Sequence, residues 1–183
     1  MIFSEKTIFL KDGRTALLRS PIEADAEKML EYIRKACGET DFLLRYPEEF
    51  SMAVEQERDW IIGLRQSPHT LAIACFVDGE VAGNCEINFM TALKMQHRAG
   101  IHIAILKEYW NLGMGSAMIS ELMAVAKADS RVEVVELELL EGNHRARALY
   151  EKYGFRIVCE RPNAFKLKDG TMLKEYFMQA SLL

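Results

Sequence analysis

The hydrophobic pattern of the chain contains several short strand-like runs. Segments 7–10, 15–19, 70–77 and 80–89 are rich in apolar and β-branched residues, which predicts four strands. An Asp-Gly step lies between the two members of each pair and supplies the positive backbone angles that a tight hairpin needs. The pattern therefore predicts two antiparallel hairpins, one at the start of the chain and one near its centre.

Two segments between these hairpins carry apolar residues at helical spacing. Asp25 is predicted to cap a helix that runs to about Ala36 and ends at Gly38. A second helix is predicted to start at Ser51 and to stop before Pro68. Two helices therefore precede the main part of the sheet.

The second half of the chain alternates strands and helices. Strands are predicted over 99–106, 132–140, 155–159 and 175–180, and helices after the turn at 113–115 and over 143–153. The whole pattern predicts an α/β (α+β) fold with a mixed, largely antiparallel central sheet flanked by helices. We expect residues 1–183 to form a single domain.

Length and charge narrow the class of protein. The chain has 183 residues, half of them hydrophobic, and a net charge of −4, which suits one domain with a sizeable core. Charges of both signs are interspersed, so a nucleic-acid-binding face is not indicated. No apolar run approaches the ~20 residues of a membrane span, and the first residues do not resemble a signal peptide. We expect a cytoplasmic protein that binds a small molecule or a peptide, and neither nucleic acid nor membrane.

The four cysteines do not indicate a metal site. Cys37, Cys75, Cys85 and Cys159 are scattered without a Cys-x-x-Cys pair, so neither a zinc site nor a disulfide framework is predicted. We expect reduced, mostly buried thiols and no metal cofactor.

The candidate chemistry begins at the turn Gly113-Met114-Gly115. Free backbone N–H groups at a helix start point at an anion, and glycine lets phosphate oxygens approach closely. A Gly-x-Gly step taken alone serves ordinary tight turns equally well. Segment 113–118 lacks the third glycine of the dinucleotide fingerprint, and no Gly-Lys-Ser/Thr follows, so neither a nicotinamide cofactor nor a nucleoside triphosphate is predicted.

A more specific motif follows one strand later. Residues 143–155 read Asn-His-Arg-Ala-Arg-Ala-Leu-Tyr-Glu-Lys-Tyr-Gly-Phe. Together with the glycine turn, this segment resembles the GNAT superfamily of acyl-CoA N-acyltransferases. Its cofactor loop reads Gln/Arg-x-x-Gly-x-Gly/Ala, and its next helix often reads Asn-x-x-Ala-x-x-Leu-Tyr-x-x-x-Gly-Phe. The order of elements also resembles this family from about Thr15 to the C-terminus. The first motif departs at Trp110, which replaces Gln or Arg, so backbone amides must carry more of the phosphate binding.

The resemblance implies an N-acetyltransferase that uses acetyl-CoA as donor and an amine of a small molecule or peptide as acceptor. It implies direct attack in a ternary complex, without a covalent enzyme intermediate. The residues that the resemblance places at the cofactor are Ile103, Ala104, Ile105, Trp110, Asn111, Leu112, Gly113, Met114, Gly115, Ser116, Asn143, Ala146 and Tyr150. Tyr150 would donate to the leaving sulfur, and a strand amide near Ile103 or Ile105 would stabilise the oxyanion.

The general base is the open part of this assignment. Many members of the family carry a glutamate early in the strand before the glycine loop, where this chain has Gly100. Glu86 is the first substitute and His102 the second, because either side chain would hold a water against the amine if it faces the cleft. A lysine-type amine with a pKa of ~10.4 needs such help, whereas an α-amine with a pKa of ~8 is already substantially neutral near neutral pH.

Other interpretations remain open from the sequence. Tyr150 is also compatible with an ordinary half-buried helix residue. The acceptor is expected to contact two segments that are predicted as loops, 39–46 and 161–165. A non-catalytic acyl-CoA-binding module is the main alternative, and an interaction protein that binds no CoA is the second. The exposed sheet edge and apolar helices are compatible with a homodimer.

Overall fold

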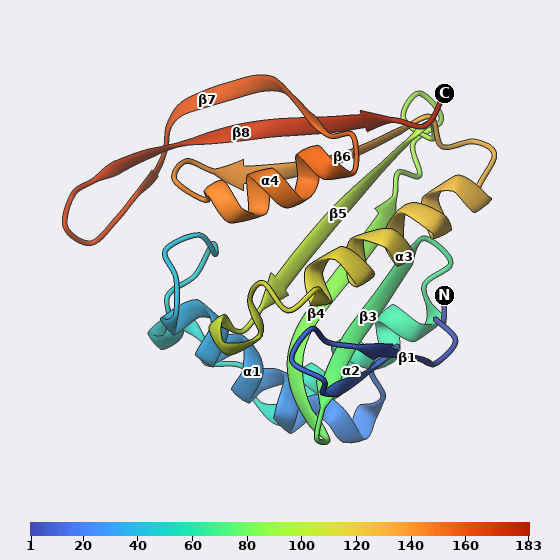
Figure 1. Ribbon diagram of the computed structural model, residues 1–183, viewed down its shortest axis with the longest axis vertical. Helices are drawn as coiled ribbons and strands as arrows, with labels where there is room; N and C mark the ends of the chain where they lie inside the picture. Colours follow the sequence, from blue (N-terminus) through green and yellow to red (C-terminus); the bar gives the residue numbers. More distant parts are fainter.

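The chain folds around one eight-stranded sheet. The structure, a computed structural model, describes residues 1–183 (Figure 1). The strands are β1 (Lys6–Phe9), β2 (Thr15–Arg19), β3 (Thr70–Val77), β4 (Glu80–Phe89), β5 (Arg98–Ile105), β6 (Val134–Leu140), β7 (Arg156–Lys166) and β8 (Met172–Ser181). The helices are α1 (Ala26–Gly38), α2 (Val54–Gln66), α3 (Met114–Ala128) and α4 (His144–Lys152).

The strand order confirms the predicted mixed, largely antiparallel sheet. The order is β1-β2-β3-β4-β5-β6-β8-β7, and only β5 and β6 run parallel. Both hairpins expected at Asp-Gly steps form, with positive φ at Gly13 and Gly79. No helix is both long and apolar enough to cross a bilayer.

Helices cover both faces of the sheet. The Tyr32 hydroxyl of α1 contacts the Asn84 side chain, whereas α3 approaches the Ile105 side chain at Gly115. Asn84 and Ile105 belong to cross-strand pairs of opposite parity, so these two helices lie on opposite faces. Figure 1 shows α3 and α4 in front of the strands.

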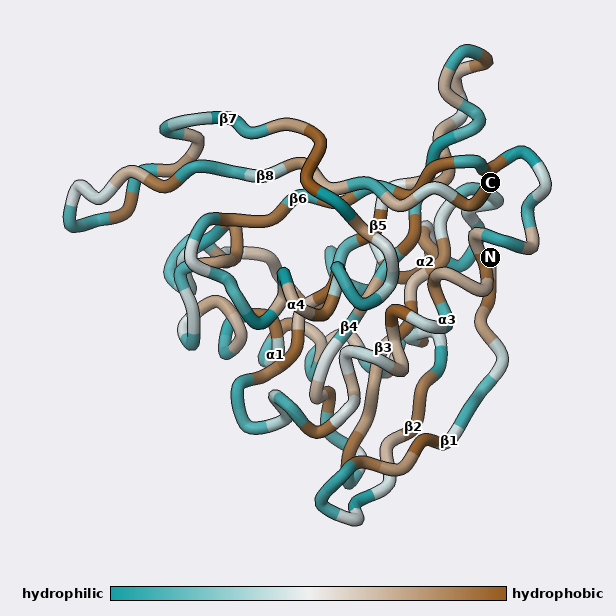
Figure 2. Tube along the Cα trace, turned by 45° about the horizontal axis from the view of Figure 1, so that its top comes forward, coloured by the Kyte–Doolittle hydropathy of each residue, from teal (hydrophilic) through white to brown (hydrophobic).

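The core lies between these layers. Ile73, Ile87, Met118 and Leu122 are fully buried, and Phe155 is almost fully buried beside them. Figure 2 shows hydrophobic stretches along the central strands and a hydrophilic turn at the tip of β7 and β8. The continuous burial of β3 explains why its sequence is an unbroken apolar run.

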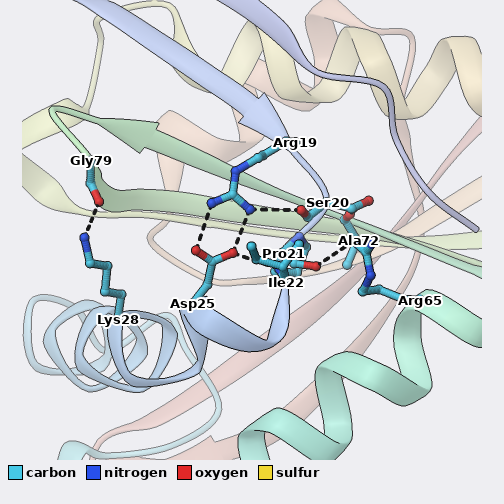
Figure 3. A network of polar contacts seen from close by, with 9 residues as sticks. All are labelled: Arg19, Ser20, Pro21, Ile22, Asp25, Lys28, Arg65, Ala72 and Gly79. Carbon is cyan, nitrogen blue, oxygen red and sulfur yellow. Dashed lines mark hydrogen bonds and ion pairs between the residues drawn. The ribbon is translucent and has the colours of Figure 1, made fainter.

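Asp25 ties the start of α1 to β2. Its carboxylate accepts hydrogen bonds from the Arg19 guanidinium at 2.6 and 2.8 Å and from the Ile22 N–H at 2.8 Å (Figure 3). Burial alone would raise the pKa of the Asp25 carboxyl, but these hydrogen bonds outweigh it and lower that pKa. Asp25 is the N-cap residue of α1, as predicted, but its side chain makes no hydrogen bond to a helix N–H, because Arg19 engages both of its oxygens.

The same network joins the layers next to β2. The Ser20 hydroxyl donates to the Ala72 carbonyl at 2.9 Å, and Arg65 of α2 donates to the Pro21 carbonyl at 3.0 Å (Figure 3). This part of the molecule is therefore tied by side chains that lie far apart in the sequence.

Several predicted boundaries are wrong. The strand predicted over 155–159 continues to Lys166, and the strand predicted over 175–180 begins at Met172. α2 begins at Val54 rather than at Ser51, because Ala53 is extended and its N–H donates to the Gln56 side chain. Segment 161–165, predicted as a loop, lies inside β7. The register of β7 shifts in this segment and Asn163 has a φ of 53°, so a bulge interrupts the alternation that marks a strand.

The cysteines agree with the sequence prediction. Cys37, Cys75 and Cys85 are buried, Cys159 is exposed, and all four are free thiols. Burial raises the pKa of the Cys75 thiol to about 12, so this thiol stays protonated at neutral pH.

Candidate active site

The parallel strands β5 and β6 separate partway along their length. Their ladder ends at the pair Gly100 and Glu136, although β5 continues to Ile105 and β6 to Leu140. Figure 1 shows the two strands diverging toward their C-terminal ends. The gap leaves one edge of β5 without a neighbouring strand.

This free edge presents the backbone groups of alternate residues. The Leu106 N–H donates to the Ala82 carbonyl of β4 at 3.0 Å. Hydrogen-bonded pairs alternate in an antiparallel ladder, so the backbone groups of Ile103 and Ile105 point away from β4 and into the gap. The Trp110 indole N–H donates to the Ile105 carbonyl at 2.8 Å, which leaves the amides of Ile103 and Ile105 as donors facing the gap.

A cleft of about 1480 Å³ opens along the gap, and we call it the main cleft. Twelve of the predicted residues line it: His102, Ile103, Ala104, Ile105, Trp110, Asn111, Gly113, Gly115, Ser116, Asn143, Ala146 and Tyr150. Leu112, Met114 and Glu86 do not line it. The Met114 side chain is fully buried in the core, so only its backbone is available at the turn.

The glycine turn is shaped for an anion. Gly113 has a φ of 93° and precedes α3, and the first N–H groups of that helix, residues 114–116, have no acceptor within it. No acidic residue lies in the first turn of α3. A Cβ atom on Gly115 would lie 3.0 Å from Leu149 Cδ2, so the close packing of α3 against α4 requires glycine there. The turn therefore presents clustered amides to the main cleft.

Three cations that the sequence motifs did not indicate also line the main cleft. Lys11, Arg145 and Lys152 line it, and none forms an ion pair. The Lys11 N–H donates to the Leu112 carbonyl at 3.0 Å, which docks the β1–β2 hairpin onto the glycine turn. The sequence offered no signal for Lys11, because hairpin and turn meet only in the folded chain.

Trp110 supports the turn in a way that its family position did not predict. Its indole N–H holds the end of β5, and the Arg145 guanidinium lies 3.0 Å from the centre of its ring. Burial lowers the pKa of Arg145, whose guanidinium nevertheless remains charged at neutral pH. Trp110 therefore positions a cation instead of supplying one.

Tyr150 is buried at the base of the main cleft. It is 7% exposed, and its ring packs against Phe155 with centroids 6.0 Å apart. Burial raises the pKa of Tyr150 to about 12, and Arg145 opposes this rise. The hydroxyl has no hydrogen-bond partner within the chain, so a protonated donor is left for a ligand in the cleft.

Asn143 precedes α4 and caps it. Its side-chain oxygen accepts from the Ala146 N–H at 3.2 Å, which orients the side chain. The amide nitrogen of Asn143 has no partner in the chain and lies on a residue that lines the main cleft. Asn143 thus presents a hydrogen-bond donor on the side of the cleft that α4 forms.

The two predicted base candidates lie on the same face of the sheet. Glu86 and His102 are cross-strand partners, but Glu86 accepts a hydrogen bond from Asn88 at 2.6 Å and lies outside the main cleft. His102 is exposed and lines the cleft. Continuing the register past Gly100 and Glu136 brings Glu138 of β6 opposite His102 across the gap.

Glu175 is a second acidic residue that the sequence did not single out. It lines the main cleft, is 3% exposed and forms an ion pair with Arg161. Burial, with a smaller contribution from Glu138, raises the pKa of the Glu175 carboxyl, while Arg161 opposes the rise. The cleft therefore contains carboxylates from β6 and β8 as well as the cations Lys11, Arg145 and Lys152.

The sequence matches the acetyltransferase (GNAT) family over residues 30–155. One curated relative, the L-amino acid N-acetyltransferase AaaT of Escherichia coli, is 27% identical over 119 residues, which cover 65% of this chain and 73% of the relative. An N-alpha-acetyltransferase of Sulfurisphaera tokodaii is 36% identical over 92 residues, which cover 45% of this chain and 54% of that relative.

Solved structures show the same fold. An acetyltransferase of the GNAT family from Streptococcus pneumoniae superimposes with a TM-score of 0.84 at 24% identity, covering 91% of this chain and 99% of its own. The yncA protein from Salmonella typhimurium, solved with its cofactor acetyl-CoA, superimposes with a TM-score of 0.75 at 17% identity. The match covers 91% of this chain and 93% of the yncA chain.

Proposed function

Because the chain belongs to the acetyltransferase (GNAT) family, we propose that it transfers the acetyl group of acetyl-CoA to an α-amine by direct attack in a ternary complex. The gap between β5 and β6 carries this proposal. It joins an amide-rich turn to the buried donor Tyr150 and to His102 within one cleft. The turn serves the phosphates of the cofactor, Tyr150 serves the sulfur of the thioester, and His102 serves the amine.

The cofactor is held mainly by backbone groups. The amides of residues 114–116 bind the pyrophosphate, and the unpaired cations Lys11 and Arg145 supply the charge that Trp110 lacks. The amide-containing pantetheine arm hydrogen-bonds to the free edge of β5, where a neighbouring strand would otherwise pair. The Asn143 amide nitrogen donates to the same arm from α4.

The chemistry follows from the groups that face the gap. A neutral amine attacks the thioester carbonyl, and the Ile103 amide donates to the oxygen as it becomes negative. Tyr150 donates a hydrogen bond to the departing sulfur. A thiol with a pKa of ~8.5 is a stronger acid than this phenol, so the sulfur leaves as a thiolate and takes its proton from solvent.

The position of Gly100 favours an α-amine over a lysine side chain. Without a glutamate at that position, His102 accepts the amine proton, with Glu138 opposite it. A peptide α-amine with a pKa of ~8 is already substantially neutral near pH 7, so a weak base is enough to remove its proton. A lysine amine with a pKa of ~10.4 is almost entirely protonated and needs a stronger base. The two curated relatives, an L-amino acid N-acetyltransferase and an N-alpha-acetyltransferase, are both named for this class of amine.

The test incubates the purified chain with acetyl-CoA and compares free amino acids and short peptides with lysine blocked at its α-amine. Acetylated product is measured by mass spectrometry. We expect peptide α-amines to be acetylated at least about 100-fold faster than blocked lysine, in line with their neutral fractions near pH 7. The α-amine of a free amino acid is more basic than that of a peptide, so a smaller ratio is expected for free amino acids. Equal rates would refute the α-amine assignment. Tight binding of acetyl-CoA without acetylation of any amine would support a binding module instead.

A further inference from the structure

The main cleft extends past the residues assigned to the cofactor. We call this extension the acceptor chamber. Its walls come from the α1–α2 connection, α2 and β7, and they are lined by Phe42, Leu43, Leu44, Phe50, Trp60 and Phe165. These residues come from two regions that lie far apart in the sequence, 42–60 and β7, and all six are large and apolar.

Part of this apolar surface is left open to solvent. Leu44 is 76% exposed and Trp60 is 42% exposed, although both line the cleft. Phe42 lies against the turn between β6 and α4, because a Cβ atom on Gly142 would sit 3.6 Å from its ring. An apolar wall that continues directly from a catalytic gap favours a ligand with an apolar group of its own.

The chamber is bridged on one side. The tip of the β7–β8 hairpin curves toward the α1–α2 connection (Figure 1). The Lys168 N–H donates to the Tyr46 hydroxyl at 3.1 Å, and the Lys168 ammonium pairs with Glu48 and lies 4.1 Å from the centre of the Tyr46 ring. A bridged chamber accommodates a small acceptor more readily than a long peptide that must leave it.

The cleft carries groups of both charges, which suit the ammonium and the carboxylate of an α-amino acid. His102, Glu138 and Glu175 lie on the side of the gap, where an amine must arrive. Arg45 lines the same cleft, carries no ion pair and lies 5.6 Å from the centre of the Phe50 ring. Its guanidinium is available for a carboxylate.

We propose that the acceptor is a free α-amino acid with a bulky apolar side chain. This inference rests on the proposed acetyl transfer to α-amines. The amine faces His102 and Glu138, the carboxylate meets Arg45, and the side chain packs against Phe42, Leu43 and Phe165.

The substrate test uses the full chain with acetyl-CoA and compares phenylalanine, glycine, phenylalanine amide and a tripeptide that begins with phenylalanine. We expect kcat/KM for phenylalanine to exceed that of each other acceptor at least about 10-fold. A tripeptide or glycine that matches phenylalanine overturns the inference while leaving α-amine acetylation intact. If no α-amine is acetylated, the proposed function falls together with it.

Two variants test the walls directly. Phe165→Ala is expected to lower kcat/KM for phenylalanine about 10-fold while the value for glycine stays within about two-fold. Lys168→Ala, which opens the bridge, is expected to raise the tripeptide rate relative to phenylalanine. Phe9→Ala is the matched control, since Phe9 is 81% exposed on β1 and outside the cleft. An equal loss for all acceptors in Phe165→Ala would reveal a purely structural role and overturn the inference.

Discussion

The two ends of the main cleft are built in different ways. At the glycine turn, the groups available to a ligand are backbone amides from one continuous segment, and the cations Lys11 and Arg145 also line the cleft. At the proposed acceptor chamber, the groups available to a ligand are side chains from α2, β7 and the α1–α2 connection, and Glu138 and Glu175 line the same cleft. One end suits a constant anionic cofactor, and the other suits a ligand that is chosen by its side chain.

The two parts of the cleft should differ in how well they tolerate substitutions of their residues. Backbone amides do not depend on side-chain identity, so the loss of the family's Gln or Arg at Trp110 leaves the cradle in place. A chamber made of side chains changes its ligand whenever one wall residue changes.

Gly113→Asp should abolish acetyl-CoA binding. Gly113 has a φ of 93°, which other residues rarely adopt, and a carboxylate there repels phosphate. We expect the dissociation constant, measured by calorimetry, to rise at least about 100-fold. Gly63→Asp is the control, because a Cβ atom on Gly63 of α2 meets nothing within 4 Å. Unchanged binding by a folded Gly113→Asp variant would place the cofactor elsewhere.

Tyr150→Phe should slow turnover without weakening cofactor binding. The substitution removes the only hydroxyl that we assign to the departing sulfur, so kcat should fall about 30-fold while acetyl-CoA affinity stays the same. Steady-state kinetics and calorimetry measure the two quantities separately. Tyr176→Phe, outside the main cleft, is the control. A variant with normal kcat would show that Tyr150 is only a packing residue.

Lys11→Gln and Arg145→Gln should each weaken acetyl-CoA binding moderately. Each removes one charge-assisted contact to phosphate, for which we expect about a five-fold rise in the dissociation constant and a weaker dependence on salt. Arg58→Gln on α2 serves as the control. If neither variant changes affinity or its salt dependence, the amides alone hold the phosphates.

Deprotonation of Tyr150 should not lower kcat at any pH up to about 10. Burial raises the pKa of Tyr150 to about 12, so the donating, protonated form persists below that pH and would be lost only above it. We expect kcat of the wild type to hold up to about pH 10. A decline near pH 9 that disappears in Tyr150→Phe would contradict a buried, protonated phenol.

Asp25→Asn should reduce stability and leave the cleft unaffected. The pKa of Asp25 is lowered in the folded chain, so its contribution to stability is present above the unfolded pKa of ~3.9 and is lost as pH falls through the folded pKa. We expect a lower denaturation midpoint at neutral pH, a difference that shrinks in acid, and no change in acetyl-CoA affinity. Altered affinity would link the β2 network to the cleft.

The two regions also differ in how far sequence predicted them. Gly113, Gly115, Asn143 and Tyr150 were predicted because each belongs to a local motif, and all four line the main cleft. Glu86 was placed outside the cleft by the structure, and the segment 161–165 lies in a strand because a bulge at Asn163 hides its alternation. Strand direction and bulges depend on neighbouring strands, which local spacing does not encode.

The order of the elements, the mixed sheet, the glycine turn and the family could all be inferred from local patterns. Periodicity, Asp-Gly steps and short motifs act between residues that are close in the chain. Folding alone brought Lys11 to the glycine turn, stacked Arg145 on Trp110 and joined Tyr46 to Lys168 beside the proposed acceptor chamber. These contacts join segments far apart in sequence, so they arise from packing and register rather than from any local preference.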